Sequence, residues 1–304
     1  MKTDQKAIIF NKVQGSFVDG WGVRTTIFLK GCPLRCRWCC NPEGQSFKPE
    51  LKVIYDDCNG CGECVAQCPQ KACWIVNGKV AVDRMQCNHC GACREFCYTG
   101  ALEPFGQEYT VEDMFQYLKK DKPFYDATGG GVTIGGGEAT CFADFVIPLM
   151  EKLHAESISV AIDTCGYVTT EEGRRVLENA DFVLFDVKGL DRERHMANTG
   201  VDNTVIWETL HWLDSIQKPI IIRLPVIPGY TDDWEEISDI AERLEGISSI
   251  KRIDILPCHH FGKVKYEQIG KAYEISEVGK VPQEYLDQIR NLFTDKGFQT
   301  QIGG

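Results

Sequence analysis

Eleven of the sixteen cysteines in this 304-residue chain fall into groups of three, four and four that have the spacing of metal ligands. Thiolates are soft ligands that suit iron–sulfur clusters. A secreted disulfide scaffold is the alternative, but such scaffolds are short and have little core. This chain is 43% hydrophobic, which is enough for a sizeable core. The cysteine spacing therefore predicts metal clusters in a reducing compartment, and we expect a cytoplasmic protein.

The first group is Cys32, Cys36 and Cys39, in a loop that follows an apolar run. Most 4Fe–4S clusters are held by four thiolates. Three thiolates leave one iron with an open position for a small molecule, just as catalytic zinc keeps a position without a protein ligand. A zinc knuckle or three unrelated core cysteines are the alternatives. The spacing favours a cluster with a vacant iron, and hence a site of chemistry.

The other two groups repeat the pattern C-x₂-C-x₂-C-x₃-C. In two-cluster ferredoxins the fourth cysteine of each such run ligates the other cluster. We therefore assign the ligands across the two runs. One predicted set is Cys58, Cys61, Cys64 and Cys97, and the other is Cys87, Cys90, Cys93 and Cys68. A pair of zinc sites is the alternative. The runs predict a ferredoxin-like insert over residues 50–108, between residues 1–49 and 109–304.

From Tyr109 onward, helical patterns alternate with short apolar strands, after an earlier strand at 23–29. We expect strands at 132–134, 158–162, 182–185, 219–224, 252–256 and 298–302. We expect helices from Thr110, where Asp113 completes a near-capping box, and at 142–154, 170–179, 203–217, 234–245 and 283–296. This alternation predicts an α/β fold with a parallel sheet. Polar residues follow the strands, where barrel enzymes build active sites, so a partial (β/α)6 TIM-type barrel fits best.

Charge and hydropathy exclude two kinds of partner. The net charge of −11 argues against a nucleic-acid surface, which needs many Lys and Arg contacts. No apolar run approaches the length of a membrane span or reads as a signal peptide. We expect a monomer that binds neither nucleic acid nor membrane.

The cysteine loop, with Trp38 just before its last cysteine, resembles the signature of the radical S-adenosylmethionine (SAM) superfamily. The wider set of motifs resembles the glycyl radical enzyme activating enzymes that carry a ferredoxin-like insert. The motifs that carry this likeness are Asp19 to Thr25, the cysteine loop, the insert, Gly136-Gly137-Glu138, Asp163-Thr164, Asp186-Val187-Lys188, Arg223 to Gly229 and His259. Each is short, and the likeness rests on their order and their placement at strand ends.

The resemblance implies how SAM is held. Gly136, Gly137 and Glu138 would bind its amino group, and Arg223 its carboxylate. Asp186 and Lys188 would lie beside SAM, with His259 near the adenosyl group and Trp38 against adenine. Asp163, Thr164 and Asp186 would hold a monovalent cation. Each has a plainer reading: a glycine-rich turn, ion pairs at a barrel mouth, a structural histidine and a core tryptophan.

The resemblance also implies a reaction. An electron from a low-potential donor such as flavodoxin or ferredoxin would reduce the cluster on Cys32, Cys36 and Cys39. SAM would be cleaved to methionine and a 5′-deoxyadenosyl radical, which takes a hydrogen atom from a backbone glycine of a partner glycyl radical enzyme. Lys188 and His259 complete the predicted catalytic set. The alternatives are a radical SAM enzyme acting on a small molecule, a radical SAM maturase that modifies a protein or peptide, and a simple electron carrier.

The chain departs from the usual family pattern in three places. Trp21 stands where proline is typical, so the turn lacks proline's fixed φ. Gly135 stands where serine is frequent. Cys40 directly follows the third predicted ligand and complicates its assignment. The change at Trp21 affects the geometry with which this turn would bind a partner protein.

Overall fold

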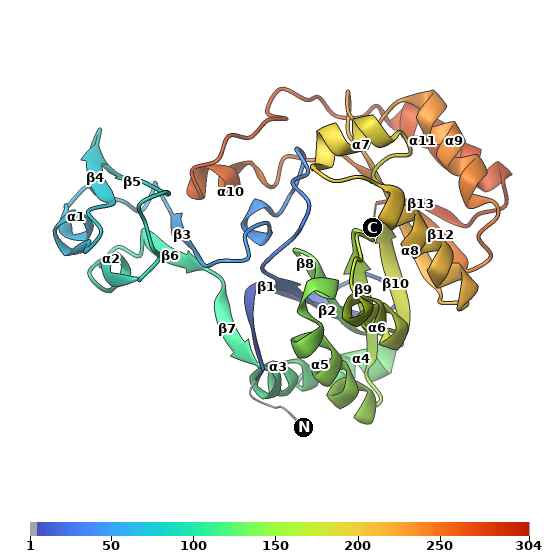
Figure 1. Cartoon of the computed structure of the whole chain (residues 1–304), viewed down its shortest axis with the longest axis horizontal. Helices are drawn as coiled ribbons and strands as arrows, with labels where there is room; N and C mark the ends of the chain where they lie inside the picture. The colour runs from blue at the N-terminus through green and yellow to red at the C-terminus, as the bar shows by residue number, and fades with distance from the viewer. Residues whose placement is uncertain (1–4, 304) are drawn as a thin grey trace.

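The computed structural model describes residues 5–303, in which nine strands form one mixed sheet (Figure 1). The order across the sheet is β13-β12-β11-β10-β9-β8-β2-β1-β7. The strands are β1 (Lys6–Ser16), β2 (Arg24–Leu29), β7 (Gln107–Thr110), β8 (Gly131–Gly136), β9 (Ser159–Thr164), β10 (Phe182–Asp186), β11 (Ile220–Val226), β12 (Ile250–Pro257) and β13 (Thr300–Ile302). The predicted α/β class is confirmed.

Seven neighbouring strands of this sheet, from β13 to β2, run parallel. The strand β1 is antiparallel to both β2 and β7 at the other edge, so the sheet is mixed and not purely parallel as expected. Because the parallel strands share one direction, their carboxyl ends lie at the same edge of the sheet. Any site built on the loops after these strands is assembled there.

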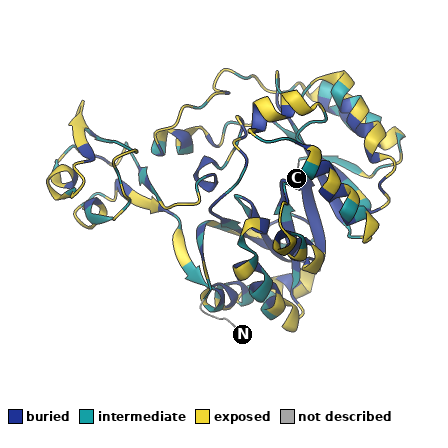
Figure 2. Ribbon diagram, in the orientation of Figure 1, coloured by how far each residue is buried: buried dark blue, intermediate teal, exposed yellow. Residues whose placement is uncertain are grey.

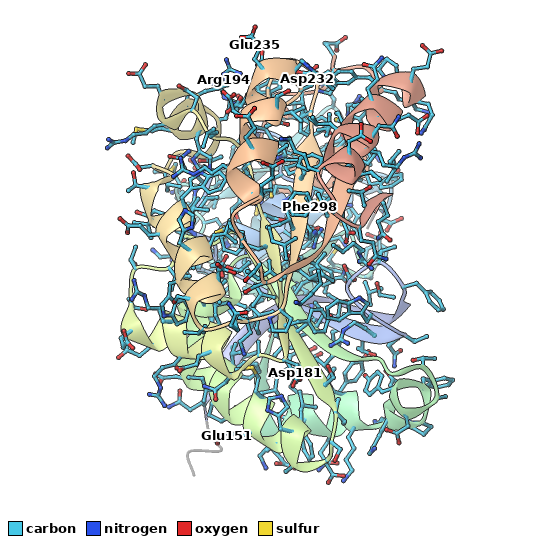
Figure 3. The ribbon with its side chains drawn as sticks, turned by 90° about the vertical axis from the view of Figure 1, so that its right-hand side faces the viewer. Glu151, Asp181, Arg194, Asp232, Glu235 and Phe298 are labelled. Carbon is cyan, nitrogen blue, oxygen red and sulfur yellow. The ribbon has the colours of Figure 1, made fainter. Side chains whose placement is uncertain are left out.

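Helices cover the outer face of the sheet (Figure 1). They are α3 (Val111–Lys119), α4 (Lys122–Thr128), α5 (Ala143–Ala155), α6 (Glu171–Asn179), α8 (Thr204–Ser215), α9 (Trp234–Leu244) and α11 (Gln283–Asp295), with the 3-10 turn η2 (Ala139–Phe142) before α5. Two further helices lie away from this face: α7 (Arg192–Thr199) contacts the loop with Cys32, and α10 (Lys263–Gln268) contacts the 3-10 turn η1 (Pro42–Gly44). Figure 3 shows Asp181, just before β10, towards one end of this layer, and Arg194 and Asp232 at the other. The loops near Arg194 and Asp232 follow the carboxyl ends of β10 and β11.

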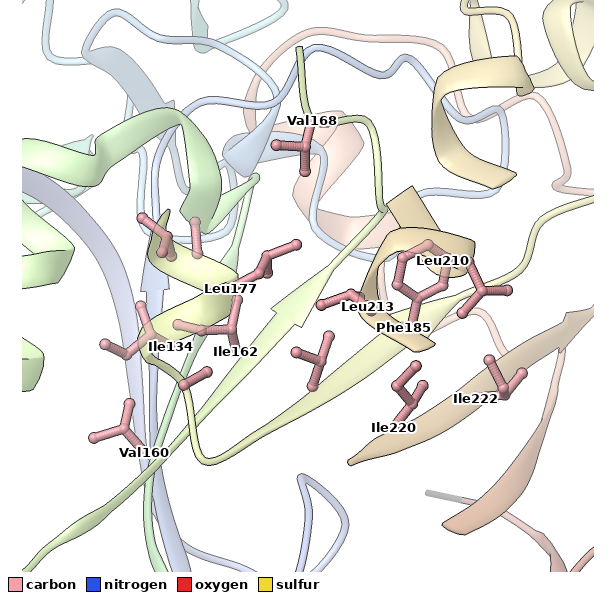
Figure 4. Close-up of a cluster of buried hydrophobic side chains, with 14 of the residues drawn as sticks. Ile134, Val160, Ile162, Val168, Leu177, Phe185, Leu210, Leu213, Ile220 and Ile222 are labelled. Carbon is pink, nitrogen blue, oxygen red and sulfur yellow. The ribbon is translucent and has the colours of Figure 1, made fainter. Parts of the chain in front are cut away.

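The main core lies between the sheet and the helices (Figure 4). Ile162, Phe185 and Ile222 point to this side from three adjacent strands, and Leu177 and Leu210 meet them from helices. The central strands β2 and β8 to β11 are mostly buried, the edge strands β1, β7 and β13 are less so, and the helices are exposed on their outer sides (Figure 2). Near-continuous apolar strands are what a sheet buried on both faces requires.

The segment with the two four-cysteine runs extends to one side of the sheet (Figure 1). It contains two small antiparallel sheets within the described residues, β3 (Glu50–Val53) with β6 (Leu102–Phe105) and β4 (Cys73–Val76) with β5 (Lys79–Val82). Two short helices, α1 (Glu63–Gln67) and α2 (Ala92–Glu95), follow the cysteine loops. The segment has its own small core around Val53, Leu102 and several cysteines.

Most expected elements are present with ends shifted by a few residues, and Thr110 and Asp113 form a full capping box. Outside the 50–108 segment, the helices α4, α7 and α10 and the strands β1 and β7 were not expected from the sequence. Residues 1–4 and 304, which belong to the two predicted outer segments, lie outside the described residues. No helix between residues 5 and 303 is both long and apolar enough to cross a membrane.

Candidate functional site

Three adjacent strands carry a layer of charge on the face of the sheet away from the helices. Side chains two residues apart on a strand share a face. Ala161, Leu184 and Ile221 pack together on that face. Two residues after these three come Asp163, Asp186 and Arg223, respectively. The strand register places Leu184 opposite Asp163, and Asp186 opposite Arg223. The apolar layer therefore forms the floor beneath a charged one.

The charged layer is internally paired. Arg223 Nη1 donates to Asp163 Oδ2 at 2.8 Å, and Arg223 Nε lies 3.6 Å from Asp186 Oδ1. Lys188 Nζ donates to Asp186 Oδ2 at 2.5 Å. Burial lowers the pKa of Lys188, but the nearby Asp186 carboxylate outweighs it, so the pKa lies above its ordinary value and the amine stays charged. Two carboxylates thus face two cations.

One donor in this layer remains without an acceptor. Arg223 Nε is buried and makes no hydrogen bond to any described residue. An unpaired buried donor of this kind costs free energy unless another group satisfies it. Because a guanidinium binds a carboxylate with two parallel hydrogen bonds, a ligand carboxylate is a fitting partner.

The glycine motif after β8 holds the cysteine loop by close backbone contact. Gly137 N donates to Leu29 O at 2.6 Å, and Glu138 N donates to Gly31 O at 2.8 Å. A Cβ on Gly137 would lie 2.1 Å from Gly31 O, so no other residue fits. Gly136 has φ +111°, which favours glycine. The motif is therefore required for packing as well as for any ligand contact.

The helix α7 supports the same loop from the other side. Arg35 N donates to Thr199 O at 2.6 Å, and Arg37 N donates to Asn198 O at 3.1 Å. The Arg35 side chain also donates to Cys32 O at 2.6 Å. The carbonyls of Asn198 and Thr199 lie at the end of the helix, where carbonyl groups have no hydrogen-bond partner inside it.

A cavity opens at the carboxyl edge of the sheet, with about 1200 Å³ of space when the part open to solvent is counted. It brings together predicted site residues from six separate stretches of sequence. These lining residues are Cys32, Cys36, Cys39, Trp38, Gly136, Gly137, Asp163, Thr164, Asp186, Lys188, Arg223 and His259. Three cysteine side chains and a set of groups suited to an amino acid thus share one space.

Glu138 is the exception, since it does not line the cavity. Its carboxylate is fully buried and accepts hydrogen bonds from Thr140, Thr164 and Cys165. Both oxygens are therefore used within the protein. The geometry does not favour the predicted contact between Glu138 and the SAM amino group. It gives Glu138 a positioning role, tying the end of β8 to the end of β9.

The predicted monovalent cation finds no support in this geometry. Asp163 and Asp186 are already neutralised by Arg223 and Lys188. Thr164 Oγ1 donates to Glu138, away from the two aspartates. The cation at these three residues therefore stays a prediction that the observed ion pairs do not support.

Two aromatic residues lie where the adenosine part of a ligand was expected. Trp38 lines the cavity and makes an edge contact with Tyr230, with ring centroids 5.9 Å apart. His259 lines the cavity and stacks on Phe261 at 4.6 Å. Burial lowers the pKa of His259, so the ring is neutral at pH 7. A neutral ring and an indole suit a flat heteroaromatic ligand.

The two four-cysteine runs form two further cavities. One is lined by Cys58, Cys61, Cys64 and Cys97, and the other by Cys68, Cys87, Cys90 and Cys93, together with Cys73. The fourth cysteine of each run thus lies with the first three of the other run. This is the grouping that the crossed assignment predicts.

Backbone N–H groups point at predicted ligand sulfurs in all three places. Leu34 N donates to Cys32 Sγ, Val80 N to Cys58 Sγ and Ala72 N to Cys68 Sγ, at 3.2 to 3.4 Å. Hydrogen bonds to sulfur are one means by which proteins set the potential of iron–sulfur clusters. Burial raises the pKa of the Cys36 thiol to about 12, so a bound metal is needed to keep it as thiolate.

Across residues 5–303, no three Cys, His, Asp or Glu side chains converge on one ion position. A tetrahedral zinc site needs four ligands about 2.0–2.3 Å from one centre. The cysteines instead surround cavities, as a larger group would require.

Several lining residues were not selected from the sequence. Asp19, Phe28, Cys165 and Cys258 all face the cavity. Cys165 is one of the five cysteines outside the three spaced groups, and only the turn after β9 brings it beside Cys32. Asp19 begins the motif Asp19 to Thr25, and the family resemblance of that motif is the signal that could have indicated it as a lining residue.

Comparison with known proteins now defines the class. The family described as "Radical SAM superfamily" matches residues 86–244, and "4Fe-4S dicluster domain" matches residues 50–98. The first match begins one residue before Cys87, so it includes the second four-cysteine run but not the Cys32 loop. A radical SAM methyltransferase from Sphaerobacter thermophilus shares the fold, with a TM-score of 0.53 at 10% identity over 92% of this chain and 66% of that one. The chain is a radical SAM protein.

Full-length relatives narrow this further. The chain is 38% identical over 98% of its length to the trans-4-hydroxy-L-proline dehydratase activating enzyme of Clostridioides difficile, covering 99% of that protein. It is 34% identical over 98% of its length to the 4-hydroxyphenylacetate decarboxylase activating enzyme of C. difficile strain CD196, covering 96% of it. The chain belongs to the activating enzymes of glycyl radical enzymes.

Proposed function

We propose that SAM binds in the cavity at the carboxyl edge of the sheet. The observation that carries this is the shared cavity, in which three cysteines face Arg223 and its unpaired Nε. A 4Fe–4S cluster held by Cys32, Cys36 and Cys39 has one iron without a protein ligand, which leaves a position for the amino and carboxylate groups of SAM.

The remaining contacts follow from the cavity lining. Arg223 binds the SAM carboxylate through Nε and keeps Nη1 on Asp163. Gly136 and Gly137 offer backbone groups to the amino group, and Lys188 adds positive charge beside the cysteines. Trp38 and His259 enclose the adenosine, which excludes water from the site.

As an activating enzyme, the protein cleaves SAM reductively, and the 5′-deoxyadenosyl radical takes a hydrogen atom from a glycine of its partner. The bound cluster supplies the electron for that cleavage. The chain's own residues hold SAM at the vacant iron and keep water away, while the open edge of the cavity admits a peptide loop.

We propose three 4Fe–4S clusters in all, one for SAM and two in the crossed quartets. The dicluster family match and the two cysteine-lined cavities support the second pair. We also propose that the parallel strands form a partial (β/α)6 barrel and that residues 50–108 are an insert in it, flanked by residues 1–49 and 109–304. The separate core of that segment supports this division.

For the partner, we propose a glycyl radical dehydratase acting on 4-hydroxyproline. The 38% identity to an activating enzyme for such a dehydratase, over nearly the whole of both chains, supports this choice. A decarboxylase acting on 4-hydroxyphenylacetate is the second candidate, supported by the 34% identity to its activating enzyme.

The test is anaerobic incubation of the reconstituted protein with SAM, titanium(III) citrate and each partner in turn. Electron paramagnetic resonance should show a glycine-centred doublet with the dehydratase. A Cys32→Ala variant should give neither the doublet nor 5′-deoxyadenosine. Cleavage of SAM by the Cys32→Ala variant would refute the cluster assignment. A doublet with the decarboxylase alone would refute the partner assignment.

A further inference from the structure

One cysteine outside the three spaced groups lies against a predicted ligand at the SAM site. Cys165 is buried, with 6% of its surface exposed, and it lines the same cavity as Cys32. The two side chains belong to one small apolar cluster, and the Cys165 sulfur lies within hydrogen-bonding distance of Cys32 Sγ. The proposed function gives this thiol no role.

Glu138 holds Cys165 and the cysteine loop together. Its backbone N donates to the O of Gly31, the residue before Cys32, at 2.8 Å. Its carboxylate accepts from Cys165 N at Oε2 and from Thr164 Oγ1 at Oε1, each at 2.8 Å. One buried residue thus bonds both segments, and the contact between the two sulfurs follows from this arrangement.

The turn that carries Cys165 is closely packed. Gly166, the next residue, has a φ of +75°, which favours glycine. A Cβ at this position would lie 2.3 Å from the ring of Phe185. Gly166 N also donates to Thr164 Oγ1 at 3.0 Å. The backbone of Cys165 is therefore fixed by its neighbours on both sides.

The roles of the two sulfurs differ. Cys32 Sγ already accepts a hydrogen bond from Leu34 N at 3.4 Å. A cysteine that binds a metal has lost its proton, so Cys32 can only accept. An ordinary thiol keeps its proton at pH 7, and its S–H group is a weak donor. In this pair, Cys165 is the donor.

A hydrogen bond to a ligand sulfur favours the reduced form of a cluster, because the reduced form carries one more negative charge. Such bonds are among the factors that set cluster potentials.

We propose that Cys165 is a positioning residue whose thiol donates to Cys32 Sγ and raises the reduction potential of the cluster on Cys32, Cys36 and Cys39. Cys165 itself is neither oxidised nor deprotonated. This inference rests on the proposed function, because it requires a cluster at these three cysteines.

The experiment is a redox titration of the reconstituted protein without SAM, followed by electron paramagnetic resonance. The signal of this cluster is the one that a Cys32→Ala variant lacks. Cys165→Ala should lower the ratio of reduced to oxidised cluster about tenfold at a given potential, which moves the midpoint down by about 59 mV. Cys165→Val should do the same, since it removes the donor but fills the space. Cys165→Ser should lie nearer wild type, because its hydroxyl still donates.

Cys141→Ala is the matched control. It also removes a thiol, but Cys141 is exposed and does not line this cavity, so the midpoint should stay at the wild-type value. Each Cys165 variant and the control should keep about 12 iron atoms per chain, which shows that the cluster sites are intact.

Two results would overturn the role of Cys165. One is a wild-type midpoint in both Cys165→Ala and Cys165→Val, and the other is an equal shift in Cys165→Ser, which keeps a donor. A wild-type protein without the signal that Cys32→Ala removes would refute the proposed function, and this inference with it.

Discussion

At the scale of single residues, the site depends on side chains that serve two partners. Arg223 binds Asp163, lies close to Asp186 and keeps Nε free within the described residues. Glu138 joins the turns after two strands through both of its oxygens. Such groups are sensitive to conservative changes, because a replacement rarely satisfies all partners at once.

Replacing Arg223 with Lys should weaken SAM binding. Lysine keeps the charge but lacks the fork that pairs with a carboxylate. We expect the dissociation constant for SAM to rise about tenfold, or about 1.4 kcal/mol. Equilibrium dialysis with the reconstituted, oxidised protein measures this. Arg252→Lys is the control, since Arg252 pairs with Asp254 away from the cavity. Equal affinities for wild type and Arg223→Lys would contradict the assignment.

Replacing Glu138 with Gln should destabilise the protein even without cofactors. The NH₂ group of glutamine would face Thr140, Thr164 or Cys165, which all donate to the Glu138 carboxylate. At least one of these buried N–H or O–H groups would then lose its acceptor. We expect a loss of about 1–3 kcal/mol in the free energy of unfolding, measured by urea denaturation of the apoprotein. Glu151→Gln, on the exposed side of α5, should change it by less than about 0.5 kcal/mol. A Glu138→Gln protein as stable as wild type would exclude the positioning role.

At the scale of elements, α7 is the unexpected support of the cysteine loop. Its sequence is polar, and the side that it buries consists of His195, Asn198 and Thr199. His195 Nδ1 donates to Val201 O at 2.8 Å, and its Nε2 finds no partner among the described residues. A neutral, buried histidine is therefore part of the contact between this helix and its surroundings.

Acid should weaken this element. Burial lowers the pKa of His195 below its ordinary value, and Lys188 adds to this while Asp202 and Glu236 oppose it. The unfolded chain, with a histidine pKa of about 6.5, then binds more protons than the folded one. Stability is present above pH 6.5 and falls as the pH drops below it.

His195→Gln should reduce this dependence. Between pH 7.5 and 5.5, wild type should lose about 1 kcal/mol more unfolding free energy than the variant. Urea denaturation of both apoproteins at each pH measures the difference. His211→Gln, on the exposed side of α8, should retain the wild-type slope. Parallel pH profiles for wild type and His195→Gln would rule out this histidine as the source.

At the scale of the whole molecule, the cysteine-rich segment is joined to the sheet by a buried ion pair. Lys30 Nζ bonds both Glu43 O and Glu50 Oε2 at 2.6 Å. Lys265 bonds Glu43 from α10 at 2.8 Å. This places the link directly beside the loop with Cys32.

The crossed cluster assignment gives a test by iron count. Cys58→Ser combined with Cys97→Ser should remove one cluster and leave about 8 iron atoms per chain. Cys87→Ser combined with Cys97→Ser should remove two and leave about 4. If each four-cysteine run instead held its own cluster, the two variants would exchange these iron counts. Iron and sulfide analysis after reconstitution decides between them, with Cys141→Ser as a control that should keep about 12 iron atoms.

The sequence by itself determined most of the periodic elements and the capping box at Thr110, because these depend on residues near in sequence. The repeated spacing also predicted which cysteines line the same cavity, whereas their roles as cluster ligands stay predictions. The sequence did not reveal α7, whose buried side is polar and lacks an apolar period.

Only the tertiary structure decided how the charged groups pair. Asp163, Asp186 and Arg223 come from three strands, and only their register shows that the carboxylates pair with Arg223 and Lys188. Glu138 finds Thr164 and Cys165 across 26 and 27 residues. Likewise, the link between the cysteine-rich segment and the sheet depends on Glu50 meeting Lys30 across 20 residues. The spacing of residues along the chain determines which nearby side chains can share a ligand or a helix turn. Which residues distant in sequence come within hydrogen-bonding distance of one another depends on tertiary packing.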